Sequence, residues 1–269
     1  MKYLFGLLLA TPLYYLSSFA LPDGPDHPAI NTAPMATTEL SAPLPSDTAP
    51  AASPVVLELF TSQGCSSCPP ADELLAKLAD EPDVIALSFH VDYWNYLGWK
   101  DPFSSPHFSA RQRDYTEALR ARTYTPQLLV NGRREMIGSR LAAVKAALAS
   151  ARAEGASQSN IHIELSSEGT DQLQVDYTLD GPLNEREVIA LLVQDEAVSS
   201  IKRGENRGRE LHHVNVVREL KSAEAKAGGS FSFTLPEGIS QAETHVVLLV
   251  QDAKTFGLYT AARSSLSAR

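Results

Sequence analysis

The two cysteines of the chain, Cys65 and Cys68, are separated by only two serines, and this spacing constrains the fold more than any other feature. They follow Val55 to Phe60, a short run of apolar, β-forming residues that predicts a buried strand. They precede two prolines, which are tolerated only in the first turn of a helix, and leucines at helical spacing up to about Ala79. The pair is therefore expected where a buried strand leads into the N-terminus of a helix.

This placement favours reactivity over structural cross-linking. A disulfide between Cys65 and Cys68 would close a loop too short to stabilise the chain much, and the sequence has no other cysteine. A helix N-terminus favours a thiolate, so we expect Cys65 to be the exposed nucleophile and Cys68 the resolving thiol. A buried reduced pair or an inert surface disulfide is the alternative. Two intervening serines do not fix the direction of the redox reaction, so oxidase, reductase and isomerase stay open.

The elements around the cysteines predict a thioredoxin-like domain over residues 54–155. A second strand-like run is followed by a helix that Ser105 caps, and Asn131-Gly132 marks a hairpin before a last helix that Ser139 caps. The resulting order is strand, helix, strand, helix, strand, strand, helix. A CxxC motif at the top of the first helix is where thioredoxin-like folds keep their active dithiol.

Beyond residue 155 the pattern changes to short segments of alternating apolar and polar residues. Seven such strands are expected between Ile161 and Ala262. They predict a small antiparallel β-sandwich-like domain at residues 160–265, separable from the first by a cut near residues 155–160.

The N-terminal segments predict export. Lys2, an apolar core and the small-x-small site Ser18-Phe19-Ala20 are typical of a signal peptide at residues 1–20, with a retained anchor as the alternative. Residues 21–53 are rich in Pro, Ala, Ser and Thr and predict a disordered tether. We therefore expect a periplasmic or secreted protein with no membrane span after cleavage. A net charge of -9 argues against nucleic acid or an anionic membrane as partner.

Two further positions suit a redox site. Thr125-Pro126, between the second helix and the next strand, is expected to be a cis bond that places the backbone of Thr125 beside the dithiol for a substrate chain; an ordinary trans proline is the alternative. Glu58 interrupts an apolar strand, where an unpaired charge would cost several kcal/mol. In related thioredoxin-like oxidoreductases an acidic residue on this strand relays the proton of the resolving thiol, and the likeness implies the same role for Glu58; a side chain that reaches a polar edge is an equal alternative.

Aromatic and charged loops offer candidate binding residues. Tyr93, Trp94 and Trp99 could line a peptide-binding groove. The favoured interpretation is that they pack this loop against the hydrophobic core. His90 could shuttle protons or join a metal site, but a single hydrogen-bonded histidine is the commoner case. The mixed-charge run at residues 199–213 could recognise a carboxylate or the neighbouring domain, while a solvated hairpin loop is favoured.

Four motifs connect the chain to a known family: LELFTSQGCSSCPPAD, SFHVDYWNYLGWKDPF, YTPQLLVNGR and ENRGR. With these, the chain resembles a secreted bacterial family catalogued as a domain of unknown function, number 1223, of the thioredoxin-like superfamily. The resemblance covers residues 54 to about 265 and implies a thioredoxin-like fold with Cys65, Cys68 and Pro126 at matching positions. The chain lacks the tryptophan that precedes the first cysteine of thioredoxin, which argues against general reductase activity.

The leading functional hypothesis is a secreted thiol-disulfide oxidoreductase that acts on exported thiol or disulfide proteins and exchanges electrons with an unidentified redox partner. This chemistry needs no cofactor and no metal. One alternative is a periplasmic protein that binds a thiophilic metal such as copper with the same cysteines. The three methionines and the lack of a histidine-rich tract weigh against it. A redox-inert adaptor is the other alternative.

Overall fold

The computed structural model describes residues 53–154 and 159–266. The predicted signal peptide at residues 1–20 and the predicted tether at residues 21–53 lie outside these ranges, apart from Ser53. Within these ranges, no helix is both long and apolar enough to span a bilayer.

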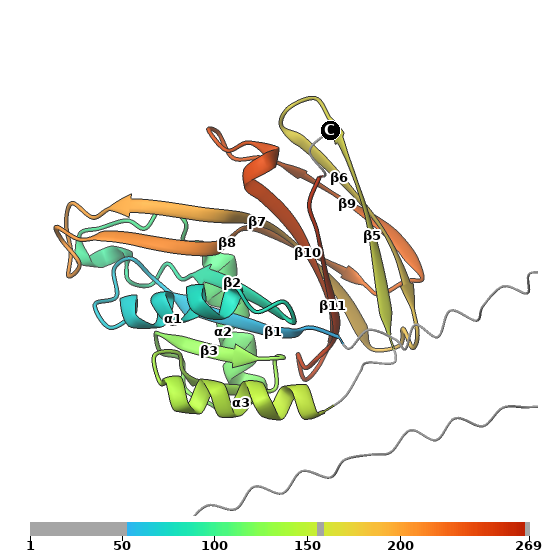
Figure 1. Ribbon diagram of the computed structural model, residues 1–269, viewed down its shortest axis with the longest axis horizontal. Helices are drawn as coiled ribbons and strands as arrows, with labels where there is room; N and C mark the ends of the chain where they lie inside the picture. The colour runs from blue at the N-terminus through green and yellow to red at the C-terminus, as the bar shows by residue number, and fades with distance from the viewer. Residues whose placement is uncertain (1–52, 155–158, 267–269) are drawn as a thin grey trace, which may run out of the picture. The chain divides into compact units, whose positions relative to one another are not determined.

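The first half of the described chain alternates strands and helices, and the second half consists of strands (Figure 1). The first half contains β1 (Val55–Thr61), α1 (Pro69–Ala79), β2 (Val84–His90), η1 (Asn95–Leu97), α2 (Pro106–Ala118), β3 (Gln127–Val130), β4 (Arg134–Ile137) and α3 (Leu141–Ala153). The second half contains β5 (Asn160–Glu168), β6 (Gln172–Asp180), β7 (Arg186–Ser200), β8 (Glu210–Glu224), β9 (Gly228–Thr234), η2 (Gln241–Glu243), β10 (Thr244–Asp252) and β11 (Leu258–Ser264).

The strands of the first half pair around β1. β1 runs parallel to β2 and antiparallel to β3, and β3 pairs antiparallel with β4 through the turn predicted at Asn131-Gly132. Both turn residues have positive φ, as this tight connection requires. Ser105 caps α2 as predicted, whereas α3 begins after Arg140 without a side-chain cap, so the cap expected at Ser139 is wrong.

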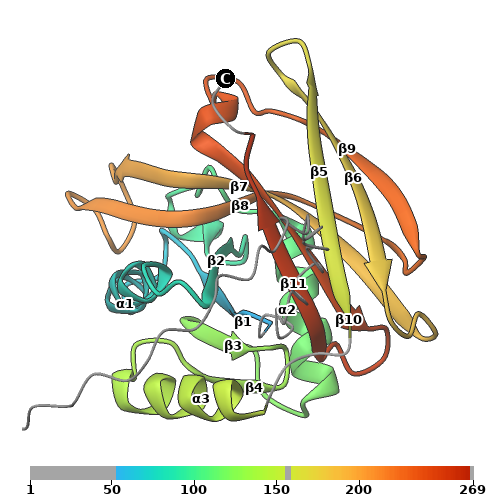
Figure 2. The same ribbon diagram turned by 45° about the vertical axis from the view of Figure 1, so that its right-hand side comes forward.

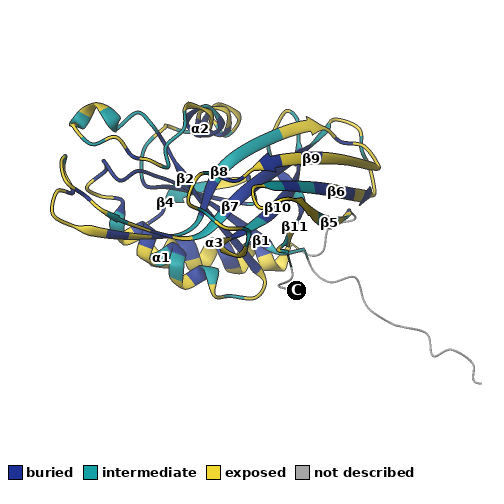
Figure 3. Ribbon diagram, turned by 90° about the horizontal axis from the view of Figure 1, so that it is seen from above, coloured by how far each residue is buried: buried dark blue, intermediate teal, exposed yellow. Residues whose placement is uncertain are grey.

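Alternate residues of β1 face opposite layers of helices. Leu57 and Leu59 pack with Leu75 and other residues of α1 and α3, whereas Val56 and Phe60 pack on the other face with residues of α2. The strand is buried along its whole length because both faces are covered. Figure 3 shows this distribution, with buried strands in the middle and exposed outer faces on α1 and α3.

The two halves share one sheet. The eight-stranded sheet has the order β11-β10-β7-β8-β2-β1-β3-β4, and the remaining strands form a three-stranded sheet in the order β5-β6-β9. β2 and β8 meet in parallel at Ser88 and Val216. All seven strands predicted beyond residue 160 are present, but four of them extend the sheet of the first half. The predicted division into two separable domains near residue 155 is therefore wrong.

The cores explain this correction. Ile189, Leu191 and Val193 of β7 lie in one cluster with Phe60 of β1 and Tyr115 of α2. The alternate β7 residues face the small sheet and pack with residues of β6 and β9. Because β7 is apolar on both faces, it cannot belong to a sandwich that is closed on itself. The fold is a mixed α/β structure with a large mixed sheet and a smaller antiparallel sheet.

β7 and β8 form a long hairpin whose far end leaves the sheet and extends past the start of α1 (Figure 2). Its tip is the segment 201–209, which we call the hairpin tip. The register shifts between Leu192 and Val193, so a bulge interrupts the hairpin where its strands still pair with β10 and β2. This hairpin carries a segment from late in the chain to the cysteines.

Candidate functional site

The cysteines form a disulfide, with their Cα atoms 5.5 Å apart. Helix α1 begins at Pro69, and Cys68 is its N-cap residue, so Cys65 precedes the helix by one turn. Ser66 and Ser67 are exposed, but Cys65 is only 1% exposed and Cys68 0%. The expectation that Cys65 is exposed is therefore wrong for this conformation.

The hairpin tip covers Cys65. The side-chain amide of Asn206 donates hydrogen bonds of 2.9 Å to the carbonyl oxygens of both Gln63 and Cys65, and Asn206 is 1% exposed. The backbone N–H of Ser66 donates to the carboxylate of Glu205 at 3.3 Å. The mixed-charge run thus contacts the CxxC segment through Asn206 and Glu205, while its charged side chains are exposed, as the interpretation of a solvated hairpin loop requires.

Gln63 connects the segments around the disulfide. Its Oε1 accepts a hydrogen bond of 2.9 Å from Nε1 of Trp99, and its Nε2 donates to Oγ of Ser199 at 2.9 Å. Its backbone N–H donates to Oδ2 of Asp101 at 2.8 Å. A residue two positions before Cys65 therefore holds both the aromatic loop and the hairpin in place.

The predicted aromatic residues are half-buried, and only part of them lies at the disulfide. Nε1 of Trp94 donates to Oγ1 of Thr125 at 2.8 Å, and the Trp94 side chain lies against the backbone of Gly64, where an added Cβ would be 3.0 Å from the Trp94 Cβ. Trp94 thus links Thr125 to the residue before Cys65. The Thr125–Pro126 bond is cis, as expected. Tyr93 instead donates to Gln112 of α2 at 3.1 Å.

Glu58 is buried on the face of β1 opposite α1. Its carboxylate accepts from Nε and Nη2 of Arg111 at 2.6 and 3.1 Å and from the hydroxyl of Tyr115 at 2.5 Å. A carboxylate held by a bidentate guanidinium is a structural ion pair. The structure therefore does not place Glu58 beneath the disulfide, and the proton relay expected of it is wrong.

A different acid is buried beside the cysteines. Asp72 lies four residues after Cys68 on α1 and is 6% exposed. Burial raises the pKa of Asp72 to about 7, against the opposing effect of His90. Its Oδ2 is 3.9 Å from Nδ1 of His213 on β8. Burial also lowers the pKa of His213 to about 3, so this contact joins an acid to a neutral imidazole.

The cluster continues through His90 at the end of β2. The rings of His90 and His213 are 4.6 Å apart, and Nδ1 of His90 lies 2.7 Å from Oδ2 of Asp101. Burial would raise the pKa of Asp101, but its interactions with His90 and with the backbone N–H groups of Gln63 and Phe103 lower it. Across the described ranges, no group of three or more His, Cys, Asp or Glu residues is arranged to hold a metal ion.

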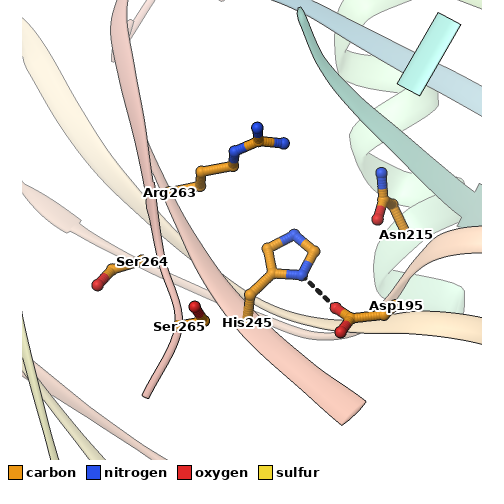
Figure 4. Close-up of a pocket in the computed structure, with 6 residues that line it drawn as sticks. All are labelled: Asp195, Asn215, His245, Arg263, Ser264 and Ser265. Atoms are coloured by element: carbon orange, nitrogen blue, oxygen red, sulfur yellow. Dashed lines mark hydrogen bonds and ion pairs between the residues drawn. The ribbon is translucent and has the colours of Figure 1, made fainter. Parts of the chain in front are cut away.

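A polar pocket of about 380 Å³ opens on the strands of the second half (Figure 4). His245 of β10 contacts Asp195 of β7 with Nδ1 2.6 Å from Oδ1, and Figure 4 shows Ser264 turned away from this contact. The lining residues are Asp195, Asn215, His245, Arg263, Ser264 and Ser265. None of the predicted site residues lines this pocket.

Sequence reasoning missed Asp72, Gln63, Asn206 and His213. Asp72 had a signal, because residues four apart on a helix lie on the same face and Cys68 was already a candidate. Gln63 is adjacent to the motif but carries no recognisable pattern, and Asn206 and His213 come from a segment distant in the sequence, which no local pattern places at Cys65.

Comparison with known proteins places the chain in a family. The model of the family described as "Protein of unknown function (DUF1223)" matches residues 56–251. The chain belongs to this family. A crystal structure of a protein from Agrobacterium tumefaciens is 30% identical, with a TM-score of 0.60, and the match covers 82% of this chain and 100% of that one. It is a solved structure that shares most of the DUF1223 fold described above.

A domain of the outer membrane lipoprotein Omp28 from Porphyromonas gingivalis is 16% identical, with a TM-score of 0.27, and the match covers 40% of this chain and 88% of that one. A likeness this weak carries no argument about the DUF1223 protein. Among curated proteins, none matches the chain.

Proposed function

We propose that this DUF1223 protein is a thiol-disulfide oxidoreductase in which Cys65 is the nucleophile and Cys68 the resolving thiol. The observation that carries the proposal is the Cys65–Cys68 disulfide at the start of α1, beside a buried acid. A disulfide that closes so short a loop adds little stability. The pair is therefore better explained by formation and reduction of the disulfide than by cross-linking.

A thioredoxin-like arrangement of residues 54–154 is part of the proposal. It is supported by the strand order β2-β1-β3-β4, with β1 parallel to β2 and antiparallel to β3. It is also supported by the helix layers, because α1 and α3 pack on one face and α2 on the other. In this arrangement β8 is an added neighbour of β2.

The reaction we propose is exchange with a substrate disulfide. The Cys65 thiolate attacks one substrate sulfur, the substrate S–S bond breaks, and the first substrate thiolate leaves. Cys68 then attacks Cys65, which releases the second substrate thiolate and forms the Cys65–Cys68 bond. The two electrons that reduce the substrate come from the dithiol, and the reverse sequence oxidises a substrate dithiol.

Access to Cys65 requires the hairpin tip to move, since Asn206 and Glu205 contact the CxxC segment in the closed conformation. The aromatic loop beside it supplies half-buried surface at Trp94 and Trp99. We propose that an exported polypeptide takes the place of the tip, and that an unidentified redox partner restores the starting state. The signal-like residues 1–20 support a periplasmic or secreted location.

The test is covalent trapping. Cys68→Ser should accumulate mixed disulfides through Cys65 on a non-reducing gel of periplasmic extract. Cys65→Ser should trap nothing, because Cys68 lies deeper at the helix N-cap. The double variant is the control for adventitious bands. Equal trapping by both single variants would refute the assigned roles. No trapping by either, with stoichiometric copper bound by wild type and lost in the double variant, would replace the proposal with metal binding.

A further inference from the structure

Asp72 and Cys68 share one buried face of α1. Cys68 has helical backbone angles, and the backbone N–H of Asp72 donates to the carbonyl oxygen of Cys68 at 3.2 Å, which is the helical bond between residues four apart. Side chains at this spacing are neighbours, roughly 5–6 Å apart between Cβ atoms. Cys68 is 0% exposed and Asp72 6%, so water has little access to either side chain.

The Asp72 carboxyl lacks the partners that a structural carboxylate has. Within residues 53–154 and 159–266, no lysine or arginine pairs with it; the Thr61 hydroxyl lies close enough to lower its pKa, and Nδ1 of His213 lacks a hydrogen-bond partner. Glu58 shows the contrast, because Arg111 and Tyr115 bind both of its oxygens. A buried acid without a cation is destabilising, so its retention beside a thiol needs a chemical reason.

The orientation of Gln63 fixes the imidazole that faces Asp72. Trp99 can only donate, so the Gln63 oxygen must face Trp99, and the amide nitrogen is then 3.5 Å from Nε2 of His213. Nε2 therefore accepts, and the proton of the neutral ring is on Nδ1, toward Asp72. A neutral donor on this side lets the carboxyl exist in either protonation state.

We propose that Asp72 is the residue that takes the proton from the Cys68 thiol when the mixed disulfide is resolved and returns it when the disulfide is reduced. This inference rests on the proposed function. The Asp72 carboxylate removes the proton, the Cys68 thiolate attacks the Cys65 sulfur, and the bond from Cys65 to the substrate breaks. The departing substrate thiolate is then protonated from Asp72 or water, so charge and protons balance.

The electrostatics fit this role. A proton acceptor works best when its pKa lies near the working pH, and burial raises the pKa of Asp72 to about 7. The titratable and charged groups that act on Asp72 and its neighbours come from four segments. They are Glu73 on α1, His90 on β2, Asp101 after η1, and His212, His213 and Arg218 on β8.

The first test does not depend on exchange activity. In a Cys65→Ser background Cys68 is the single thiol, and the ultraviolet absorbance of its thiolate reports its ionisation. We expect a two-step titration, which is the behaviour of two groups that interact by more than about one pK unit. Asp72→Asn should leave one step, at lower pH, because the neighbouring negative charge is gone. Asp72→Glu should retain two steps. Glu73→Gln, which removes the same charge from an exposed neighbour, should keep both steps and shift them only slightly, because Glu73 is the smallest of the effects on the Asp72 pKa.

The second test follows resolution with Ellman's reagent as the probe. Attack by Cys65 releases one coloured thiolate, and closure by Cys68 releases a second. Asp72→Asn should slow the second release at neutral pH by at least about tenfold and leave the first unchanged. The rate of the second release in wild type should rise with pH near the Asp72 titration.

The outcomes separate the two proposals. Identical titrations and second-release rates in Asp72→Asn and Glu73→Gln would overturn the role of Asp72, while two releases in wild type would keep the oxidoreductase. If wild type never releases the second thiolate, the proposed oxidoreductase function is overturned. The titration would then still show whether Asp72 and Cys68 interact. If Asp72→Asn fails to fold, Asp72→Glu serves instead, since a longer carboxyl must shift both steps.

Discussion

The side-chain amide of Asn206 lies 2.9 Å from the carbonyl oxygen of Cys65, although the two residues are 141 positions apart in the chain. The same amide holds Gln63, so one side chain joins the hairpin tip to the CxxC segment at two points. Opening the site requires breaking both hydrogen bonds.

Asn206→Ala should therefore make the disulfide easier to reach. Two hydrogen bonds contribute about 1–3 kcal/mol net, so we expect a small soluble phosphine to reduce Cys65–Cys68 about tenfold faster. Lys202→Ala, at an exposed position in the same tip, should leave the rate unchanged. Equal rates in the two variants would show that the tip does not control access.

Arg111→Ala should strongly destabilise the fold. It leaves the Glu58 carboxylate buried without its cation, which costs about 3–5 kcal/mol of unfolding free energy in denaturant titrations. Arg113→Ala, on the exposed side of α2, should change stability by about 0.5 kcal/mol or less. Replacing Glu58 and Arg111 together by Leu and Met should recover most of the loss. A similar loss from both arginine variants would contradict this account.

Asp72 and His213 should oppose each other in the pH dependence of stability. Folded Asp72 keeps its proton up to a pKa of about 7, against 3.8 for the ordinary carboxyl, so its contribution falls as pH rises between these values. Folded His213 stays neutral down to a pKa of about 3, against 6.5 ordinarily, so its contribution falls as pH decreases.

The two single variants should expose these slopes. As pH rises from roughly 4 to 6.5, the unfolding free energy of Asp72→Asn relative to wild type should increase by about 1 kcal/mol per pH unit. Over the same range that of His213→Gln should decrease at a similar rate. Denaturant titrations at several pH values measure both slopes, with Glu73→Gln as the reference. Parallel curves for all three variants would disprove the assignment of protonation states.

Residues 53–154 alone should not fold cooperatively. The fragment lacks Ile189, Leu191 and Val193, which complete the cluster around Phe60. Each buried aliphatic side chain contributes about 1.5–3 kcal/mol, and the net stability of a domain is only about 5–15 kcal/mol. Circular dichroism melting and limited proteolysis of the fragment against residues 48–269 test this. A sharp melting transition of the fragment would restore the two-domain division.

Local patterns in the sequence determine the elements well but not how the halves join. The strand at Val55 to Phe60, the turn at Asn131-Gly132 and the Ser105 cap all follow from neighbouring residues, and each is present. The continuous sheet had one overlooked signal. Val188 to Val193 is apolar without alternation, which is typical of a strand covered on both faces.

The candidate site was only partly predictable for the same reason. Cys65, Cys68 and Pro126 sit in recognisable local contexts. Glu58 was misassigned because a charged residue in an apolar strand does not show what its side chain pairs with. Its partner, Arg111, lies 53 residues away in the sequence. The burial of Asp72 and Cys65 depends on a hairpin whose register and length involve strands paired far from the cysteines.

Asn206 bonds the hairpin tip to the CxxC segment, and this contact limits how the length of the hairpin can vary in evolution. Tips of surface hairpins ordinarily accept insertions and deletions. Here, removing two residues from each of β7 and β8 would withdraw Asn206 by roughly 7 Å, since each strand residue spans about 3.3 Å. The carbonyl oxygens of Gln63 and Cys65 would then lose their donor. We expect the hairpin to keep its length wherever the two cysteines are kept, and to vary in length where they have been lost.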